Sequence, residues 1–175
     1  QLSGVMKQKL ALCCALVHKP KVLFLDEPTT GVDAVSRKEF WEMLKRLKQQ
    51  GITILVSTPY MDEATLCERI ALIQNGKIMS IDTPGKIVKN YPKNLYAIKA
   101  GKMSKLLEDL RKTELIDSSN AFGEYHHISL KQDTENNRKL LLNSLTEKGN
   151  LNIEINPTSP TIEDCFIQLM TTIHE

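Results

Sequence analysis

Apolar and polar positions follow two different periods along the first 90 residues of the chain. Two short, nearly continuous apolar runs, KVLFLDEP (21–28) and ITILVST (52–58), are typical of strands buried on both faces of a parallel sheet. Between them, residues 37–50 place apolar side chains at helical spacing, and Gly51 is a favourable C-terminal cap. Another apolar helix is predicted from Ser3 to about residue 18. The alternation of helices and strands predicts an α/β fold.

The pattern then predicts a short helix at 61–69, whose acidic Asp62 and Glu63 suit the positive end of a helix dipole. Residues 70–82 are typical of a hairpin that turns at Asn75-Gly76, and a further helix begins at Pro84.

A polar stretch with a proline, VKNYPKN (88–94), predicts a linker, so we expect two domains, at 1–90 and 91–175. The second domain should contain a strand, a helix, two strands, a helix, a strand and a last helix. Their expected ranges are 95–100, 102–113, 114–120, 124–131, 133–148, 150–156 and 161–173. This order is typical of a small ferredoxin-like α+β domain.

Composition narrows the classes of function. The chain is 41% hydrophobic and 25% charged, as in ordinary globular proteins. A net charge of +2 and an aromatic content of 5% argue against a nucleic-acid partner. No apolar stretch approaches the roughly 20 residues of a membrane span. The four cysteines form no CxxC pair, and Cys13 and Cys14 are expected to be free thiols buried on a helix, which favours a reducing, cytoplasmic setting.

Candidate chemistry lies at the end of the first apolar strand. Asp26 and Glu27 stand where open α/β sheets bind ligands, so Asp26 could hold Mg²⁺ and Glu27 could polarise an attacking water. Taken alone, two solvated acids are the commoner meaning of such a strand end. Ser3 and Gly4 form a helix start that favours a phosphate, although a plain N-cap is the commoner explanation.

The order of these motifs changes that balance. LSGVMKQK (2–9) precedes VLFLDEP (22–28), TTGVDAVSR (29–37) follows at once, and ILVST (54–58) leads to Pro59. In this order they resemble the signature motif, Walker B strand, D-loop and switch position of the nucleotide-binding domain of ABC transporters. The resemblance covers about residues 1–90, including the closing hairpin and helix at 70–87. SPTIEDCFIQLM (159–170) also resembles the ending of the multidrug and ABC-2 exporter ATPases.

The resemblance implies a mechanism in which two such domains enclose two ATP molecules. Asp26 would serve Mg²⁺ and Glu27 would act as general base. Ser3 and Gly4 would contact the γ-phosphate of ATP bound to the opposite domain, and Asp33 would link the two sites. ATP hydrolysis would then drive a transmembrane permease from the inner face of the cell membrane, where the protein would be peripheral and cytoplasmic.

Three departures from the family pattern modify this expectation. No GxxxxGK[ST] phosphate loop (Walker A) occurs, and the chain opens on Gln1, so we expect a C-terminal fragment that is inactive by itself. Val5 replaces the second glycine of the signature, where its Cβ either crowds a phosphate or is tolerated. Pro59 stands where the family has a switch histidine, so it is either a harmless turn or the mark of a degenerate site.

A rival interpretation is a catalytically inactive ABC-fold interaction or regulatory module. The accessory domain would either mediate contact between ATPase subunits or regulate them. The apolar stripe of its last helix, which carries Ile162, Phe166, Leu169 and Met170, fits a domain core better than a partner surface.

Overall fold

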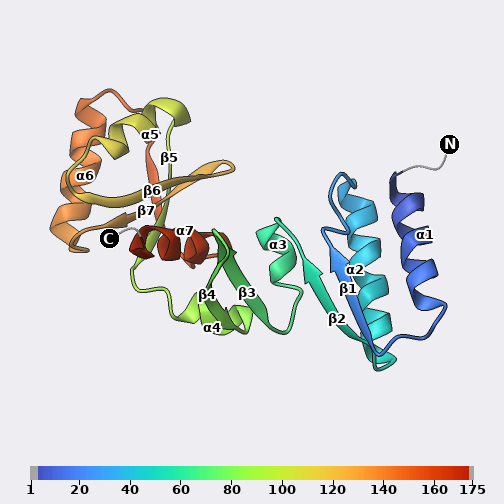
Figure 1. The fold of residues 1–175 in the computed structure, drawn as a ribbon. Helices are drawn as coiled ribbons and strands as arrows, with labels where there is room; N and C mark the ends of the chain where they lie inside the picture. Colours follow the sequence, from blue (N-terminus) through green and yellow to red (C-terminus); the bar gives the residue numbers. More distant parts are fainter. Residues whose placement is uncertain (1–3, 174–175) are drawn as a thin grey trace. The chain divides into compact units, whose positions relative to one another are not determined.

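The computed structural model describes residues 4–173 (Figure 1). The chain divides into two compact units, with the division between Pro84 and Gly85. Each unit has its own cluster of buried apolar side chains. Among the described residues, no helix has both the length and the apolar character needed to cross a membrane.

The first unit combines a parallel strand pair with helices and an antiparallel hairpin. Its elements are α1 (Gly4–Leu16), β1 (Val22–Asp26), α2 (Ala34–Gln49), β2 (Thr53–Ser57), α3 (Met61–Ala64), β3 (Ile70–Gln74) and β4 (Lys77–Asp82). β1 and β2 pair in parallel, from Val22 opposite Thr53 to Asp26 opposite Ser57. The α/β prediction is thereby confirmed.

The β3–β4 hairpin turns where the sequence predicts. Asn75 and Gly76 have φ angles of 50° and 72°, the left-handed conformation that a two-residue hairpin requires at both positions. Glycine adopts this conformation without a steric penalty, and asparagine tolerates it better than most residues.

One face of the parallel pair packs against the two long helices. Leu23 is buried with Leu12 of α1 and with Phe40 and Leu44 of α2. Alternation along the strands places Val22, Phe24 and Leu55 on the opposite face, where they are 47%, 73% and 61% exposed. The expectation that both strands are buried on both faces is therefore wrong for this face of the described unit.

Helix α1 corrects a further expectation. Cys13 and Cys14 are exposed, so the prediction of buried thiols is wrong for this pair. The side of α1 that packs against β1 and α2 is the one that carries Leu12 and Leu16. Cys14 lies two residues from each of these leucines, so it does not have the three- or four-residue spacing that shares a helix face. Cys13 lies three residues from Leu16, and it is exposed nevertheless.

The second unit is a four-stranded antiparallel sheet with helices. Its elements are β5 (Leu95–Lys99), α5 (Met103–Arg111), β6 (Ile116–Phe122), β7 (Tyr125–Leu130), α6 (Glu135–Glu147), β8 (Glu154–Thr158) and α7 (Ile162–Ile173), and α4 (Pro84–Lys89) begins at the boundary of the two units. The sheet order is β6-β7-β5-β8, and all three pairs are antiparallel. This is the split βαβ arrangement of the predicted ferredoxin-like domain.

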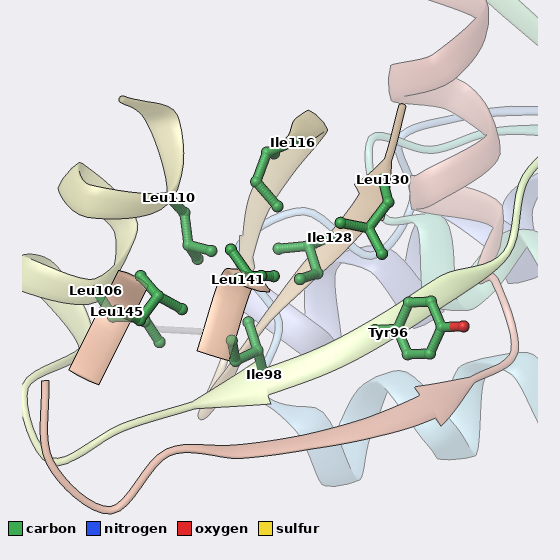
Figure 2. Close-up of a cluster of buried hydrophobic side chains, with 9 residues drawn as sticks. All are labelled: Tyr96, Ile98, Leu106, Leu110, Ile116, Ile128, Leu130, Leu141 and Leu145. Carbon is green, nitrogen blue, oxygen red and sulfur yellow. The ribbon is translucent and has the colours of Figure 1, made fainter. Parts of the chain in front are cut away.

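Leucines of α5 and α6 form the core of this unit with apolar side chains of one sheet face. Figure 2 shows Leu106 and Leu110 of α5 and Leu141 and Leu145 of α6 pointing toward Ile128 and its neighbours on the strands. All five side chains are fully buried. The buried core as a whole joins side chains from β5, α5, β6, β7 and α6.

The other face of the sheet is tied to α7. His126 points to the face covered by α5 and α6, where its Nε2 lies 2.8 Å from the carbonyl oxygen of Met103. His127 points to the face of α7, where its Nδ1 lies 3.0 Å from Asp164. The two histidines thus point to opposite faces, as predicted. Asp164 also accepts hydrogen bonds from the N–H and hydroxyl of Thr161 at the start of the helix, and Thr161 in turn accepts one from the Asp164 N–H. One buried carboxylate therefore starts α7 and attaches it to β7.

Two adjacent leucines on α6 test how this core is built. Leu141 is fully buried and Leu140 is 47% exposed. Leu141→Ala should lower the free energy of unfolding by about 2–5 kcal/mol because it leaves a cavity, and Leu140→Ala should cost about 0.5 kcal/mol or less. Urea denaturation followed by far-ultraviolet circular dichroism measures both, and similar losses for the two variants would contradict the assigned core.

Candidate functional site

Asp26 and Glu27 lie at the carboxyl edge of the β1–β2 pair, where Ser57 contacts both. Asp26 is the last residue of β1 and stands opposite Ser57 in the register. The Ser57 hydroxyl donates to Asp26 Oδ1 and accepts from the Glu27 N–H at 2.9 Å. The Ser57 carbonyl oxygen lies 3.1 Å from the same Glu27 nitrogen. The end of β2 therefore holds both predicted acidic residues at one edge, and both are exposed.

The backbone of Glu27 is in an uncommon conformation. Its φ is 44°, in the left-handed region that residues other than glycine seldom adopt. The two bonds from its N–H to Ser57 support this conformation. On the other side, the Thr30 hydroxyl donates to Glu27 Oε2 at 3.1 Å, and the Thr30 N–H donates to the Glu27 carbonyl at 3.2 Å. The Glu27 side chain thus leaves a strand end that is fixed by residues on both sides.

The oxygen ligands available at this edge suit a magnesium ion that also binds a nucleotide. Among residues 4–173, no group of three or more His, Cys, Asp and Glu side chains could hold a metal ion. Asp26 instead offers one carboxylate beside the Ser57 hydroxyl. Mg²⁺ is usually bound by one or two carboxylates together with substrate phosphates and water, so this donor set fits a magnesium–nucleotide complex.

Asp33 is the N-cap of α2. Its carboxylate accepts hydrogen bonds from the Val35 N–H at 3.1 Å and the Ser36 N–H at 3.0 Å. These bonds, first of all the one from the Ser36 backbone, lower the pKa of Asp33 below its ordinary value. The hydrogen bonds of this carboxylate go to the start of α2 and not to the residues at the edge.

The remaining predicted residues lie near the same edge or outside the described range. Pro59 follows β2 by two residues and is exposed. Gly4 is the first residue of α1, whereas Ser3 and the side chain of Val5 lie outside what the structure describes. Gln8 of α1 donates from Nε2 to the Thr30 carbonyl at 3.4 Å, which connects this helix to the loop after Glu27.

Sequence reasoning missed the buried carboxylate of Glu63. It is 2% exposed and accepts hydrogen bonds from the hydroxyls of Thr29 and Thr58 and from Nε of Arg37. The helix predicted over 61–69 is shorter in the structure, because α3 spans only Met61–Ala64, and Glu63 in its first turn is buried. A usable pattern was present, since each parallel strand is followed within three residues by one of these threonines.

Known proteins with similar sequences are ATP-binding proteins of transporters. The profile of the ABC transporter family matches residues 1–30. The "Probable multidrug ABC transporter ATP-binding protein YbhF" of Escherichia coli is 35% identical over 172 residues, which cover 97% of this chain and 29% of that protein. The chain therefore spans less than a third of that relative's length.

Two further comparisons cover about half of the chain. The "Daunorubicin/doxorubicin resistance ATP-binding protein DrrA" of Streptomyces peucetius is 38% identical over 98 residues, which cover 55% of this chain and 30% of that protein. A solved structure is also similar, that of cbiO1 from Clostridium perfringens, which is part of the ABC transporter complex cbiONQ. The match has 32% sequence identity and a TM-score of 0.47, and it covers 51% of this chain and 36% of cbiO1.

The cap of α2 generates a pH prediction. Because the pKa of Asp33 lies below 3.8 in the folded chain, its contribution to stability is present above the unfolded pKa and is lost as the pH falls through the folded pKa. A nuclear magnetic resonance titration of the Asp33 carboxyl carbon should give a midpoint below 3.8, and Asp33→Asn should remove this part of the acid sensitivity. A midpoint at or above 3.8 would contradict the cap geometry.

Proposed function

Because the chain belongs to the ABC transporter family, in its ATP-binding part, we propose that the intact protein binds and hydrolyses ATP to power export across a membrane. The observation that carries this proposal is the β1–β2 edge, where Ser57 binds the Asp26 carboxylate and the Glu27 N–H, so that two exposed acidic residues stand next to each other at the strand end. Carboxyl ends of parallel strands are the usual ligand sites of open α/β sheets. The chain spans less than a third of the length of the Escherichia coli relative, which supports a larger working unit.

In this proposal the two carboxylates have different roles. Asp26 holds Mg²⁺, directly or through water, and the ion when bound neutralises the charge of the nucleotide phosphates. Glu27 orients the attacking water and accepts its proton. The Thr30 hydroxyl holds one oxygen of the Glu27 carboxylate, so the side chain presents the other oxygen from a fixed direction. Precise placement matters because a general base must lie within hydrogen-bond reach of the water.

We further propose that the site is completed by a second ATP-binding domain, in a homodimer or in a tandem chain. Ser3 and Gly4 would then contact the γ-phosphate of ATP on that domain, since a helix N-terminus offers free N–H groups to an anion. Asp33 would lie between the two sites. The phosphate loop would come from a part of the intact protein outside these 175 residues, so this chain alone would be inactive.

The exporter role is supported by the relatives, whose names refer to multidrug transport and to drug resistance. In that role the intact protein would be cytoplasmic and would act at the inner face of the membrane beside a transmembrane permease. Residues 91–175 would form an accessory domain that contacts another ATPase subunit or regulates it.

Pro59 supports a second candidate function. Proline has no N–H to donate and no group that titrates, so it cannot replace a side chain that contacts a γ-phosphate. With Val5 in the signature, it favours a degenerate site whose intact protein depends on a better second site, or a wholly inactive interaction module. Turnover of ATP by the variants Glu27→Gln and Pro59→His separates these possibilities.

Glu27 can be tested as the general base. In the intact protein, Glu27→Gln should lower the turnover of ATP by about 10²–10⁴-fold, because the amide cannot accept the proton of the water. Phosphate release under saturating ATP measures it. Glu39→Gln, which changes an exposed acid in the surface pair with Lys9, is the control and should behave as wild type. If Glu27→Gln keeps wild-type turnover, the assigned base is wrong, and a wild type without turnover favours the interaction module.

Pro59 can be tested as a lost switch position. Pro59→His in the intact protein should raise the turnover of ATP by about 10-fold or more, since one lost transition-state contact typically costs about 10²–10³-fold. The matched control is Pro92→His, which makes the same change at an exposed proline of the second unit. Unchanged or lower turnover for Pro59→His would contradict a lost switch and would mark Pro59 as a simple turn.

A further inference from the structure

Glu63 is a buried carboxylate that joins segments from both parallel strands. Its Oε2 accepts from the Thr29 hydroxyl at 3.0 Å and from the Thr58 hydroxyl at 2.6 Å. Its Oε1 lies 3.1 Å from Nε of Arg37, near the start of α2. Thr29 follows β1 by three residues and Thr58 follows β2 directly, so one carboxylate receives donors from both strand ends.

The chemistry of the cluster requires an acid at this point. A buried charge is costly unless it is paired and hydrogen-bonded, and here the guanidinium of Arg37 supplies the opposite charge. Arg37 also pairs with Asp62 at 2.8 Å and lies 4.3 Å from the centre of the Tyr60 ring. The arginine therefore contacts the residues on both sides of Met61, and the Glu63 carboxylate fixes the arginine in turn.

The same contacts fix the two residues that flank Pro59 in the sequence. Thr58 precedes it, and besides donating to Glu63, the Thr58 hydroxyl accepts a hydrogen bond from the Tyr60 N–H at 3.1 Å. Tyr60 follows it and stacks under the Arg37 guanidinium. Both neighbours of Pro59 are thus attached, directly or through Arg37, to the Glu63 carboxylate. The backbone of the predicted switch position has little freedom to move while these bonds persist.

The other side of the cluster leads to the predicted base. Thr29 lies two residues after Glu27, and Ser57, which bonds the Glu27 N–H, lies directly before Thr58. A displacement of the Glu63 carboxylate would therefore move the segment that carries Glu27 and the segment that carries Pro59 relative to each other. A misplacement of about 1 Å at a reacting group can cost about 10²-fold in rate.

We propose that Glu63 is a positioning residue for the hydrolysis of ATP, which sets the Thr58–Tyr60 segment against the Glu27–Thr30 loop. The inference rests on the proposed function and deepens it. Glu63 is buried and bonded to its threonine and arginine partners, so it would act through them. Its effect should fall on the chemical step, while the groups proposed to bind phosphate and Mg²⁺ stay in place.

The experiment compares four variants of the intact protein, with kcat and KM for Mg-ATP normalised to the fraction of active protein. Glu63→Gln keeps the shape of the side chain and removes its charge. Thr58→Val removes one hydroxyl with little change in volume, and Thr58→Ser restores that hydroxyl. Glu68→Gln makes the same chemical change as Glu63→Gln at an exposed acid that pairs with Lys48 at the surface.

We expect kcat to fall about 10-fold in Glu63→Gln and Thr58→Val with KM changed less than about twofold. Thr58→Ser should recover most of the loss, and Glu68→Gln should match the wild type. A lower melting temperature with an unchanged kcat per active site would overturn the inference, because it would make Glu63 a residue of stability alone. A rise in KM equal to the fall in kcat would overturn it as well. If Glu63→Gln does not fold, the Thr58 pair decides in the same way.

Glu27→Gln in the same assay separates this inference from the proposed function. If Glu27→Gln is inactive and Glu63→Gln keeps the wild-type kcat, the inference alone is overturned. If Glu27→Gln stays active, the proposed base is wrong and the positioning role falls with it.

Discussion

Parallel pairing of β1 with β2 is the constraint on which the first unit depends. Strands that run in the same direction end at the same edge, so the residues after Asp26 and after Ser57 become neighbours although 31 positions separate these two residues. The Ser57 hydroxyl then bridges the aspartate and the Glu27 N–H. An antiparallel arrangement of the same two strands would place these groups at opposite ends of the pair.

In the second unit, a buried carboxylate attaches a helix to a sheet. Its antiparallel sheet can be covered by α5 and α6 on one face because their leucines match the apolar side of the strands. The last helix is attached to the other face through a polar contact, between His127 and the buried Asp164. In both units, a buried carboxylate with several donors connects elements that are distant in sequence, since such a group cannot remain buried without partners.

Features that depend on short stretches could be predicted from the sequence. The Asn75-Gly76 turn, the two apolar strands and the strand–helix order of the second unit follow from local conformational preference and spacing. Burial of Cys13 and Cys14 was predicted wrongly because an apolar helix does not reveal which side its neighbours will cover. The burial of Glu63 could not be predicted for a related reason. Its partners at 29, 37 and 58 come together only after the strands have paired.

The positive φ of Glu27 has a consequence for the history of this position. A non-glycine residue in the left-handed region costs roughly 1–3 kcal/mol, and glycine would adopt the same backbone shape at lower cost. Folding alone would therefore favour a residue without a side chain at the end of β1. A glutamate at this position places a carboxylate at the edge of the strand pair at the cost of an unfavourable backbone conformation. Substitution by glycine, which a turn with a purely structural role would tolerate, should therefore be selected against at this position.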